Sequence, residues 1–404
     1  MTMGAETKRI LIITGEASGD LHGAHLAQAL KALDPSLSIL GVGGARMRAA
    51  GVRLLDGIAQ LDVIGLIGPR ALGVLEKRVL ALRRCLRSEA CDLVVLIDQP
   101  GLNFHFARIA KSIGSRVVYY IAPQLWAWRP GRMNWMRRRV DHAVVILPFE
   151  EELYRQAAVP CTFVGHPLLD EMAPNYDRDR IRATYSLPPQ GLVLGLLPGS
   201  RMGEIRALLP LMLGAVQKLA PAIGPSSIIL AVAETVDRDE IKRLCDQAGV
   251  DVRQITGDPT GVMAASNLLF VASGTATLQA AIIGTPMVIV YKMPWMGYLI
   301  ARLLSGTSAA MAARRICWPE TPTMACIGLP NLIAGRQFIA ELIQTQATPE
   351  RLAAEAQRIL NDDSYRQNMR SEMAKVRSRL GAPGASRRAA DAILKVLMSE
   401  EART

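Results

Sequence analysis

The sequence lacks an uncharged apolar run of the ~18–20 residues that a membrane-spanning helix needs. The best candidate, Met287 to Leu304, is interrupted by Lys292, Pro294 and Arg302. At the N-terminus, a basic pair is followed by a mostly apolar run of only five residues, Ile10–Thr14, and a glycine. This pattern indicates a first strand rather than a signal peptide. We therefore expect neither a membrane span nor a secretion signal.

Other chemical signatures are missing from the 404 residues. The six cysteines form no CxxC pair, which is typical of reduced thiols in a cytosolic protein. The five histidines form no metal-spaced pair, and we expect neither a metal site nor a cofactor. Aromatic residues make up only 5%, so the core must be mostly aliphatic.

Acidic residues are also in the minority. Asp and Glu number 36 against 47 Lys and Arg, which leaves a net charge of +11. The excess indicates an anionic partner, either a nucleic acid, an anionic membrane surface or a phosphorylated substrate. No recognisable RNA- or DNA-binding motif accompanies the basic stretches, so we expect no nucleic-acid partner.

The chain is rich in apolar strands that run into a glycine turn and then a helix. Continuous apolar strands alternating with helices predict an α/β fold with parallel sheets covered on both faces. Two such sets indicate two Rossmann-like domains with a ligand in the cleft between them, at the carboxyl ends of the strands. The predicted strands are Arg9–Thr14, Leu37–Val42, Leu93–Ile97, Val117–Ile121 and Ala143–Ile146 in the first set, and Leu192–Leu197, Ser227–Val232, Leu268–Val271 and Met287–Tyr291 in the second.

The composition also predicts where the domains end. We expect a first domain over residues 1–168 and, in the proline- and charge-rich stretch 169–191, an interdomain connection with one short helix. A second domain follows over residues 192–348, and helices occupy residues 349–404, with packing of these helices back on the first domain left open.

Two loops of the second domain have the character of anion sites. Gly199-Ser200-Arg201 lies between a strand and a helix that begins near Gly203, and Ser273-Gly274-Thr275 lies between a strand and the next helix. Helix N-termini offer unpaired N–H groups and partial positive charge, and a guanidinium fits phosphate oxygens. Gln279 follows one turn later, where it could reach a ribose. Together these loops favour a nucleoside diphosphate, although each alone is equally compatible with a surface turn.

Two loops of the first domain are also candidates for a role in the chemistry. Asp98 directly follows a buried strand, where apolar walls can raise a carboxyl pKa toward a useful general-base value; the alternative is a helix cap. The loop containing Gly15, Ser18 and Gly19 departs from the dinucleotide spacing GxGxxG, which disfavours NAD. Its small residues still allow close approach to a helix N-terminus.

A basic, apolar stretch precedes the third strand of the first domain. Leu72, Leu75, Val79, Leu82 and Leu86 have the spacing of one helical stripe, and the segment 61–87 around them is rich in Arg and Lys. It predicts either an ordinary sheet-packing helix or a surface that meets an anionic membrane.

Taken together, the motifs resemble one family. They are GEASGDLHGA (15–24), GVGGARM (41–47), IDQPGLN (97–103), APQLWAWRPGR (122–132), LPFE (147–150), VGHPL (164–168), LLPGSRMGEI (196–205), SGTATLQ (273–279) and GLPNLIAGR (328–336). In this order they resemble the lipid-A-disaccharide synthases. The resemblance implies a metal-independent, inverting GT-B glycosyltransferase that joins UDP-2,3-diacylglucosamine to 2,3-diacylglucosamine 1-phosphate (lipid X). The products are UDP and a β-1,6-linked disaccharide phosphate.

The resemblance also assigns roles to residues. Asp98 is the expected general base. UDP-sugar contacts are expected from Gly199, Ser200, Arg201, Ser273, Gly274, Thr275 and Gln279. Contacts with the acceptor or the cleft are expected from Glu16, Ser18, Gly19 and Asn331. The family implies a cytoplasmic enzyme associated peripherally with the inner membrane, which fits the segment 61–87. The oligomeric state stays open, with a homodimer as one option.

Two positions depart from the family pattern. Family members commonly carry Glu at the position of Gln279, where a carboxylate holds the ribose hydroxyls; Gln keeps one acceptor without the charge. They often carry Asp at the position of Gly101, so Asp98 is the stronger single candidate for a base. The alternatives are another UDP-sugar GT-B enzyme, such as a 2-epimerase or the peptidoglycan glucosaminyltransferase, and a non-enzymatic nucleotide-sensing membrane adaptor.

Overall fold

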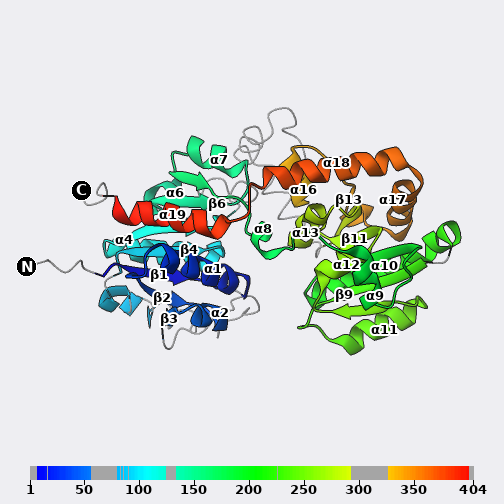
Figure 1. Cartoon of the computed structure of the whole chain (residues 1–404), viewed down its shortest axis with the longest axis horizontal. Coiled ribbons are helices and arrows are strands. Elements are labelled where there is room, and N and C mark those ends of the chain that lie inside the picture. Colours follow the sequence, from blue (N-terminus) through cyan, green and yellow to red (C-terminus); the bar gives the residue numbers. More distant parts are fainter. Residues whose placement is uncertain are drawn as a thin grey trace, which may run out of the picture. The chain divides into compact units, whose positions relative to one another are not determined.

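The computed structural model describes residues 7–15, 17–55, 80–81, 83–84, 86–89, 91–123, 133–224, 226–292 and 326–399. These residues form two compact units. Unit 1 runs to Asp170 and resumes at Leu380, and unit 2 takes the described residues from Glu171 to Arg379. Figure 1 labels the elements of both units.

Unit 1 is built on a parallel sheet in the strand order β3-β2-β1-β4-β5-β6-β7. The strands are β1 (Arg9–Ile13), β2 (Ser38–Val42), β3 (Arg53–Leu54), β4 (Leu93–Ile97), β5 (Arg116–Tyr120), β6 (His142–Val145) and β7 (Cys161–Phe163). The helices are α1 (Ala17–Leu33), α2 (Ala45–Ala49), α4 (Pro100–Ser112), α6 (Met133–Arg139), α7 (Glu150–Gln156), α8 (Leu168–Glu171) and, at the far end of the chain, α19 (Ala385–Met398).

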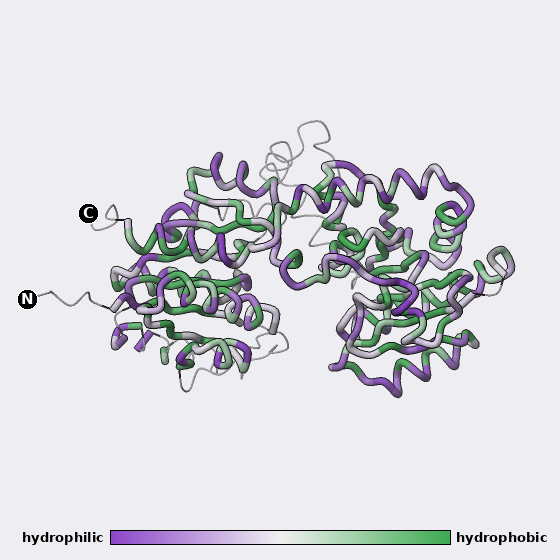
Figure 2. Tube along the Cα trace, in the orientation of Figure 1, coloured by the Kyte–Doolittle hydropathy of each residue, from purple (hydrophilic) through white to green (hydrophobic). Residues whose placement is uncertain are grey.

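The strands of unit 1 send alternate side chains into two separate cores. Ile10 and Ile12 pack with α1 and α19, whereas Leu11 and Ile13 pack with α4 and α6. This period of two is what a parallel strand requires when helices cover both of its faces. The strands of both units accordingly appear hydrophobic along most of their length (Figure 2).

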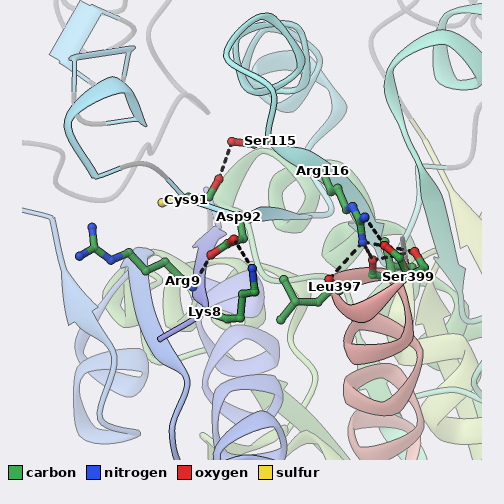
Figure 3. A network of polar contacts seen from close by, with 9 residues as sticks. Lys8, Arg9, Cys91, Asp92, Ser115, Arg116, Leu397 and Ser399 are labelled. Atoms are coloured by element: carbon green, nitrogen blue, oxygen red, sulfur yellow. Dashed lines mark hydrogen bonds and ion pairs between the residues drawn. The ribbon is translucent and has the colours of Figure 1, made fainter. Parts of the chain in front are cut away.

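Helix α19 belongs to unit 1 although it follows all of unit 2 in the sequence. It packs beside α1, and Figure 1 shows the two helices on the same side of the sheet. The guanidinium of Arg116, at the start of β5, donates to the Leu397 carbonyl at 3.1 Å and to the Ser399 hydroxyl at 3.2 Å (Figure 3). These bonds satisfy acceptors at the C-terminus of α19, where cations are favoured.

Unit 2 has a second parallel sheet in the order β10-β9-β8-β11-β12-β13. The strands are β8 (Leu192–Leu197), β9 (Ser226–Val232), β10 (Arg253–Thr256), β11 (Leu268–Ala272), β12 (Met287–Tyr291) and β13 (Glu341–Ile343). The helices are α9 (Arg178–Thr184), α10 (Met202–Ile223), α11 (Arg238–Ala248), α12 (Pro259–Ala265), α13 (Thr275–Ile283), α16 (Leu329–Ala334), the 3-10 helix η2 (Gln344–Gln346), α17 (Pro349–Asn361) and α18 (Asp363–Arg379).

The stretch expected to connect the domains contains the boundary between the two units, at Asp170–Glu171, and the expected short helix, α9. From Glu171 onward it is part of unit 2, and its helix α9 packs against α12. The buried Arg182 of α9 donates to the Ala265 carbonyl at 3.0 Å and to Asn267 Oδ1 at 2.7 Å. The helices after Pro349 are divided between the units: α17 and α18 belong to unit 2, and α19 returns to unit 1.

Candidate functional site

Each sheet has one point where the strand order turns back on itself. In unit 1 the point lies between β1 and β4, and in unit 2 it lies between β8 and β11. At such a point the loops that follow the two strands diverge to opposite faces and leave a crevice at the carboxyl ends. Apart from Asn331, the residues expected to carry chemistry lie in the loops and first helical turns that follow these four strands.

In unit 2, the loops after β8 and β11 each start a helix without a side-chain cap. The N-cap residues of α10 and α13 are Arg201 and Gly274, and neither accepts a capping hydrogen bond through a side chain. By contrast, α9, α11, α12 and α17 in the same unit each begin with a capping bond, from Asp177, Asp237, Asp258 and Thr348 respectively. Orphan N–H groups at the start of a helix are available to an anion.

The side chains at these two loops face solvent. Ser200, Arg201, Gly274 and Thr275 are exposed, and Gln279 is half-buried one turn into α13. Because β8 and β11 pair in register, with Leu197 beside Val271, the two loops are neighbours. Unit 2 therefore presents two positive helix ends and one guanidinium to the same region. This arrangement can hold two adjacent phosphates without a metal ion.

We call the two loops, with their helix starts, the cradle. Position 199 of the cradle requires glycine. Its φ of +115° lies in the range that favours glycine. A Cβ at this position would lie 2.3 Å from Glu204 Oε2, because the Glu204 side chain folds back from the first turn of α10. Glu204 also pairs with Arg201 at 3.5 Å. A carboxylate thus lies against the loop that is expected to hold the phosphates.

Asn331 is placed differently from the expected substrate contact. Its side chain is completely buried, and its Nδ2 donates to the Ile339 carbonyl at 2.8 Å and to Glu341 Oε1 at 2.7 Å. Its Oδ1 accepts from the backbone N–H groups of Phe338 and Ile339, both at 3.0 Å. Both donors and both acceptor positions are occupied within the protein. The geometry therefore gives Asn331 a positioning role in the loop around α16.

Glu341 is the partner that sequence reasoning missed. Besides Asn331, its carboxylate accepts from the N–H groups of Ile327 at 2.8 Å and Gly328 at 3.0 Å. Burial raises the pKa of this carboxyl, and the three hydrogen bonds oppose the shift. The Ile327 carbonyl in turn accepts from Ser273 Oγ at 3.4 Å. Asn331 and Glu341 thus hold the 326–331 segment beside the Ser273 turn.

In unit 1, Asp98 follows β4 at the switch point. Asp98 is exposed to solvent, yet protein atoms also surround it closely, and this partial desolvation raises the pKa of the carboxyl above its usual value. The N–H of Gln99 partly opposes the shift. A carboxylate that holds its proton more tightly than usual and still reaches solvent is suited to accept a proton from a bound hydroxyl.

The loop after β1 touches the loop that carries Asp98. A Cβ at Gly15 would lie 1.4 Å from Gln99 Oε1, so the Gln99 side chain crosses directly over Gly15. Gly19 packs against Thr14, where an added Cβ would lie 3.1 Å from the threonine Cβ, and Ser18 is exposed in the first turn of α1. The structure therefore brings together the loops of Gly15, Ser18, Gly19 and Asp98.

Asp20 explains why two separate sequence motifs of unit 1 occur together. Its buried carboxylate accepts from the N–H groups of Gly44 at 2.7 Å, Arg46 at 3.1 Å and Met47 at 3.2 Å. It thus caps α2 from the neighbouring helix α1. The motif at 15–24 supplies the carboxylate and the motif at 41–47 supplies the N–H groups that this carboxylate binds, so the two motifs depend on each other.

Some expected features lie outside the described residues. They are Glu16, most of the motif at 122–132 and most of the segment 61–87. Among the described residues no cluster of His, Cys, Asp or Glu could hold a metal ion. No helix in the described ranges has both the length and the apolar character needed to cross a membrane.

Comparison with solved structures identifies the class. The UDP-GlcNAc 2-epimerase of Neisseria meningitidis is 12% identical with a TM-score of 0.63, covering 96% of this chain and 100% of that one. Acinetobacter baumannii MurG is 15% identical with a TM-score of 0.56, covering 96% and 99%. With two open parallel sheets and switch-point loops, the chain has the GT-B fold of glycosyltransferases and related sugar-nucleotide enzymes.

Sequence comparison is more specific. The family model described as lipid-A-disaccharide synthetase matches residues 10–396. The lipid-A-disaccharide synthase of Syntrophus aciditrophicus is 40% identical over 98% of this chain and 99% of its own length. That of Geobacter sulfurreducens is 39% identical over 96% and 97%. The chain belongs to the lipid-A-disaccharide synthase family, which confirms the resemblance and the two-domain α/β prediction.

Proposed function

We propose that this glycosyltransferase of lipid A biosynthesis transfers the sugar of UDP-2,3-diacylglucosamine to the 6-hydroxyl of lipid X. The bond between C1 and the diphosphate oxygen breaks, and a β-1,6 bond to the acceptor oxygen forms. The hydroxyl proton passes to a base, and UDP leaves. Family membership supports the reaction, and the paired, uncapped helix starts after β8 and β11 are the observation that carries the donor site.

In this proposal, unit 2 holds the UDP-sugar. The N–H groups around Gly199–Arg201 and Ser273–Thr275 and the Arg201 guanidinium receive the diphosphate, and Gln279 accepts from one ribose hydroxyl. Negative charge grows on the diphosphate as the bond to C1 breaks. Preorganised dipoles and a guanidinium stabilise that charge without a metal ion. Asn331 contributes indirectly, by holding the segment beside Ser273.

Unit 1 receives the acceptor, and Asp98 removes its proton. Ser18, Gly19 and Glu16 line the acceptor loop in this proposal. A positioned base contributes ~10²–10⁴ in rate. We therefore expect Asp98→Asn to lose about that factor in kcat while the Kd for UDP, measured by calorimetry, stays the same. Unchanged turnover in Asp98→Asn would remove Asp98 from the role.

The test of the reaction itself uses the purified protein with both acylated sugars. We expect UDP and a disaccharide phosphate, each detected by mass. A UDP-sugar 2-epimerase would instead alter UDP-N-acetylglucosamine with no acylated acceptor present. A nucleotide-binding adaptor would bind UDP and form no disaccharide.

We further propose that the enzyme works in the cytoplasm at the inner membrane, with segment 61–87 as its contact. The basic and apolar side chains of this segment support the idea, since each basic residue near an anionic leaflet contributes about 1 kcal/mol. Sedimentation with anionic vesicles, compared with neutral ones, tests it. Light scattering of the same preparation decides between a monomer and a homodimer.

A further inference from the structure

Two consecutive residues after β4 have a backbone conformation that side chains disfavour. Asp98 has a φ of +49° and Gln99 a φ of +39°, and neither is glycine. Left-handed residues other than glycine carry a free-energy cost and persist only where their surroundings fix them. Two in succession at the candidate base indicate that the strain is maintained by specific contacts.

Those contacts converge on the carbonyl oxygen of Asp98. Asn103 Nδ2 donates to it at 2.7 Å, and the Tyr119 hydroxyl donates to it at 2.7 Å. Asn103 Nδ2 also donates to the Ile97 carbonyl at 3.0 Å, while the Asp98 N–H donates to the Tyr120 carbonyl at 3.2 Å. The peptide groups on both sides of Asp98 are thus held from α4 and from β5.

The two donors are themselves fixed. Asn103 is 1% exposed and Tyr119 is completely buried. Tyr119 packs against Phe104 in an edge-to-face contact with ring centroids 6.4 Å apart. Burial raises the pKa of Tyr119 well above its usual range, so its hydroxyl keeps its proton and stays a donor at neutral pH. Both side chains are too deeply buried to meet a substrate.

We propose that Asn103 and Tyr119 are positioning residues that hold the Asp98–Gln99 backbone in its left-handed conformation. This conformation presents the Asp98 carboxyl at the end of β4 and sends the Gln99 side chain across Gly15. The inference rests on the proposed function only in taking Asp98 as the base. We call the grip of Asn103 and Tyr119 on this backbone the clamp. The clamp concerns backbone geometry alone and does not depend on that assignment.

Tyr119→Phe removes one donor and leaves the ring. We expect kcat to fall about 10-fold, the effect of one lost hydrogen bond. The KM for the UDP-sugar should stay unchanged, because that substrate binds unit 2. With the clamp loosened, Asp98 becomes more solvated, so its pKa, followed by ¹³C NMR of labelled aspartate, should move down toward the ordinary value.

Tyr120→Phe is the matched control. Tyr120 follows Tyr119 on β5 and is equally buried, but its ring belongs to the core on the other face of the sheet. We expect kcat and the Asp98 pKa of this variant to equal those of the parent. A similar loss in both variants would show general damage to β5 and overturn the clamp.

Asn103→Ala provides a second route if Tyr119→Phe does not fold. It removes the other donor, and we expect the same fall in kcat and the same downward shift of the Asp98 pKa. An unchanged Asp98 pKa in a folded variant overturns the inference, even where Asp98→Asn is inactive. If Asp98→Asn keeps full turnover, the base assignment fails, whereas a shifted Asp98 pKa in Tyr119→Phe still supports the clamp.

Discussion

Asn331 donates through Nδ2 to Glu341 Oε1 at 2.7 Å, and both side chains are buried. Through this bond, and through the N–H groups of Ile327 and Gly328, one carboxylate organises the segment that precedes α16. Because Ser273 Oγ donates to the Ile327 carbonyl, the same carboxylate supports the proposed diphosphate cradle from behind. The buried pair therefore links the stability of unit 2 to its proposed nucleotide site.

Glu341→Gln tests this link. The amide nitrogen would face a backbone N–H in place of an acceptor, and a buried donor left without a partner costs about 1–3 kcal/mol. We expect the urea midpoint to fall accordingly and UDP to bind more weakly. Glu355→Gln, which changes a carboxylate of α17 that accepts from the Tyr365 hydroxyl at 2.7 Å, is the control for UDP binding. Equal UDP affinity in Glu341→Gln and the parent would contradict the link.

At Glu204, by contrast, we expect a substitution to strengthen the binding of UDP. Its carboxylate lies against Gly199 and pairs with Arg201, so it competes with any anion bound there. Removing one like charge at about 4 Å in water gains about 1 kcal/mol, and we expect Glu204→Gln to bind UDP about fivefold more tightly. Titration calorimetry at two salt concentrations measures this. Glu240→Gln, which removes an equal charge paired with Arg206, should leave the affinity unchanged; weaker binding in Glu204→Gln would show that its carboxylate positions Arg201.

Asp98→Asn should make unit 1 more stable while it removes activity. Burial raises the folded-state pKa of Asp98 above its ordinary value of 3.8. The folded protein therefore holds this proton more tightly than the unfolded chain, and ionisation destabilises the fold as the pH rises through the folded-state pKa. Asn carries no charge and tolerates the left-handed conformation. We expect a higher melting temperature at pH 7 and no difference from the parent below pH 3.8; a lower melting temperature at pH 7 would contradict this account.

His166 makes the stability of unit 1 sensitive to acid. Burial lowers the pKa of His166, and that of the nearby His22, to about 4, from an ordinary value of 6.5. Between these values the unfolded chain binds more protons, so stability is lost as the pH falls from 6.5 toward 4. For His166 the loss amounts to about 3 kcal/mol.

His166→Asn should flatten this dependence, since Asn can still accept from the Leu168 N–H that His166 Nδ1 now receives at 3.2 Å. Urea midpoints across the pH range measure it. His105→Asn, on the exposed side of α4, is the matched control and should keep the parental slope. If the slope of His166→Asn also equals that of the parent, the burial of His166 does not govern the acid response.

The sequence was most informative where one strand buries both of its faces. The bounds of Leu93–Ile97, Leu192–Leu197 and Met287–Tyr291 agree with the structure because each is a continuous apolar run. The strands β3, β7, β10 and β13 were missed, because each is an edge strand of two to four residues with no apolar run to distinguish it.

In the candidate site, the loops could be predicted from the sequence, but the residues that hold those loops in place could not. Asp98 stood out because it directly follows a buried strand. The roles of Tyr119 and Glu341 depend on partners more than ten residues away and on backbone angles that no local pattern encodes. Asn331 was expected to contact the substrate for the same reason. A motif does not distinguish a residue that contacts the substrate from one that supports the loop.

The position of α19 has a consequence for biosynthesis. Ala389, Ala390 and Ile393 complete the core that β1 and α1 begin, yet they leave the ribosome only after all of unit 2. Until then the nascent first unit exposes an apolar face to chaperones and to neighbouring chains. Premature termination anywhere before α19 would therefore leave unit 1 without part of its core, even where unit 2 is complete, and such products are expected to be cleared by proteolysis.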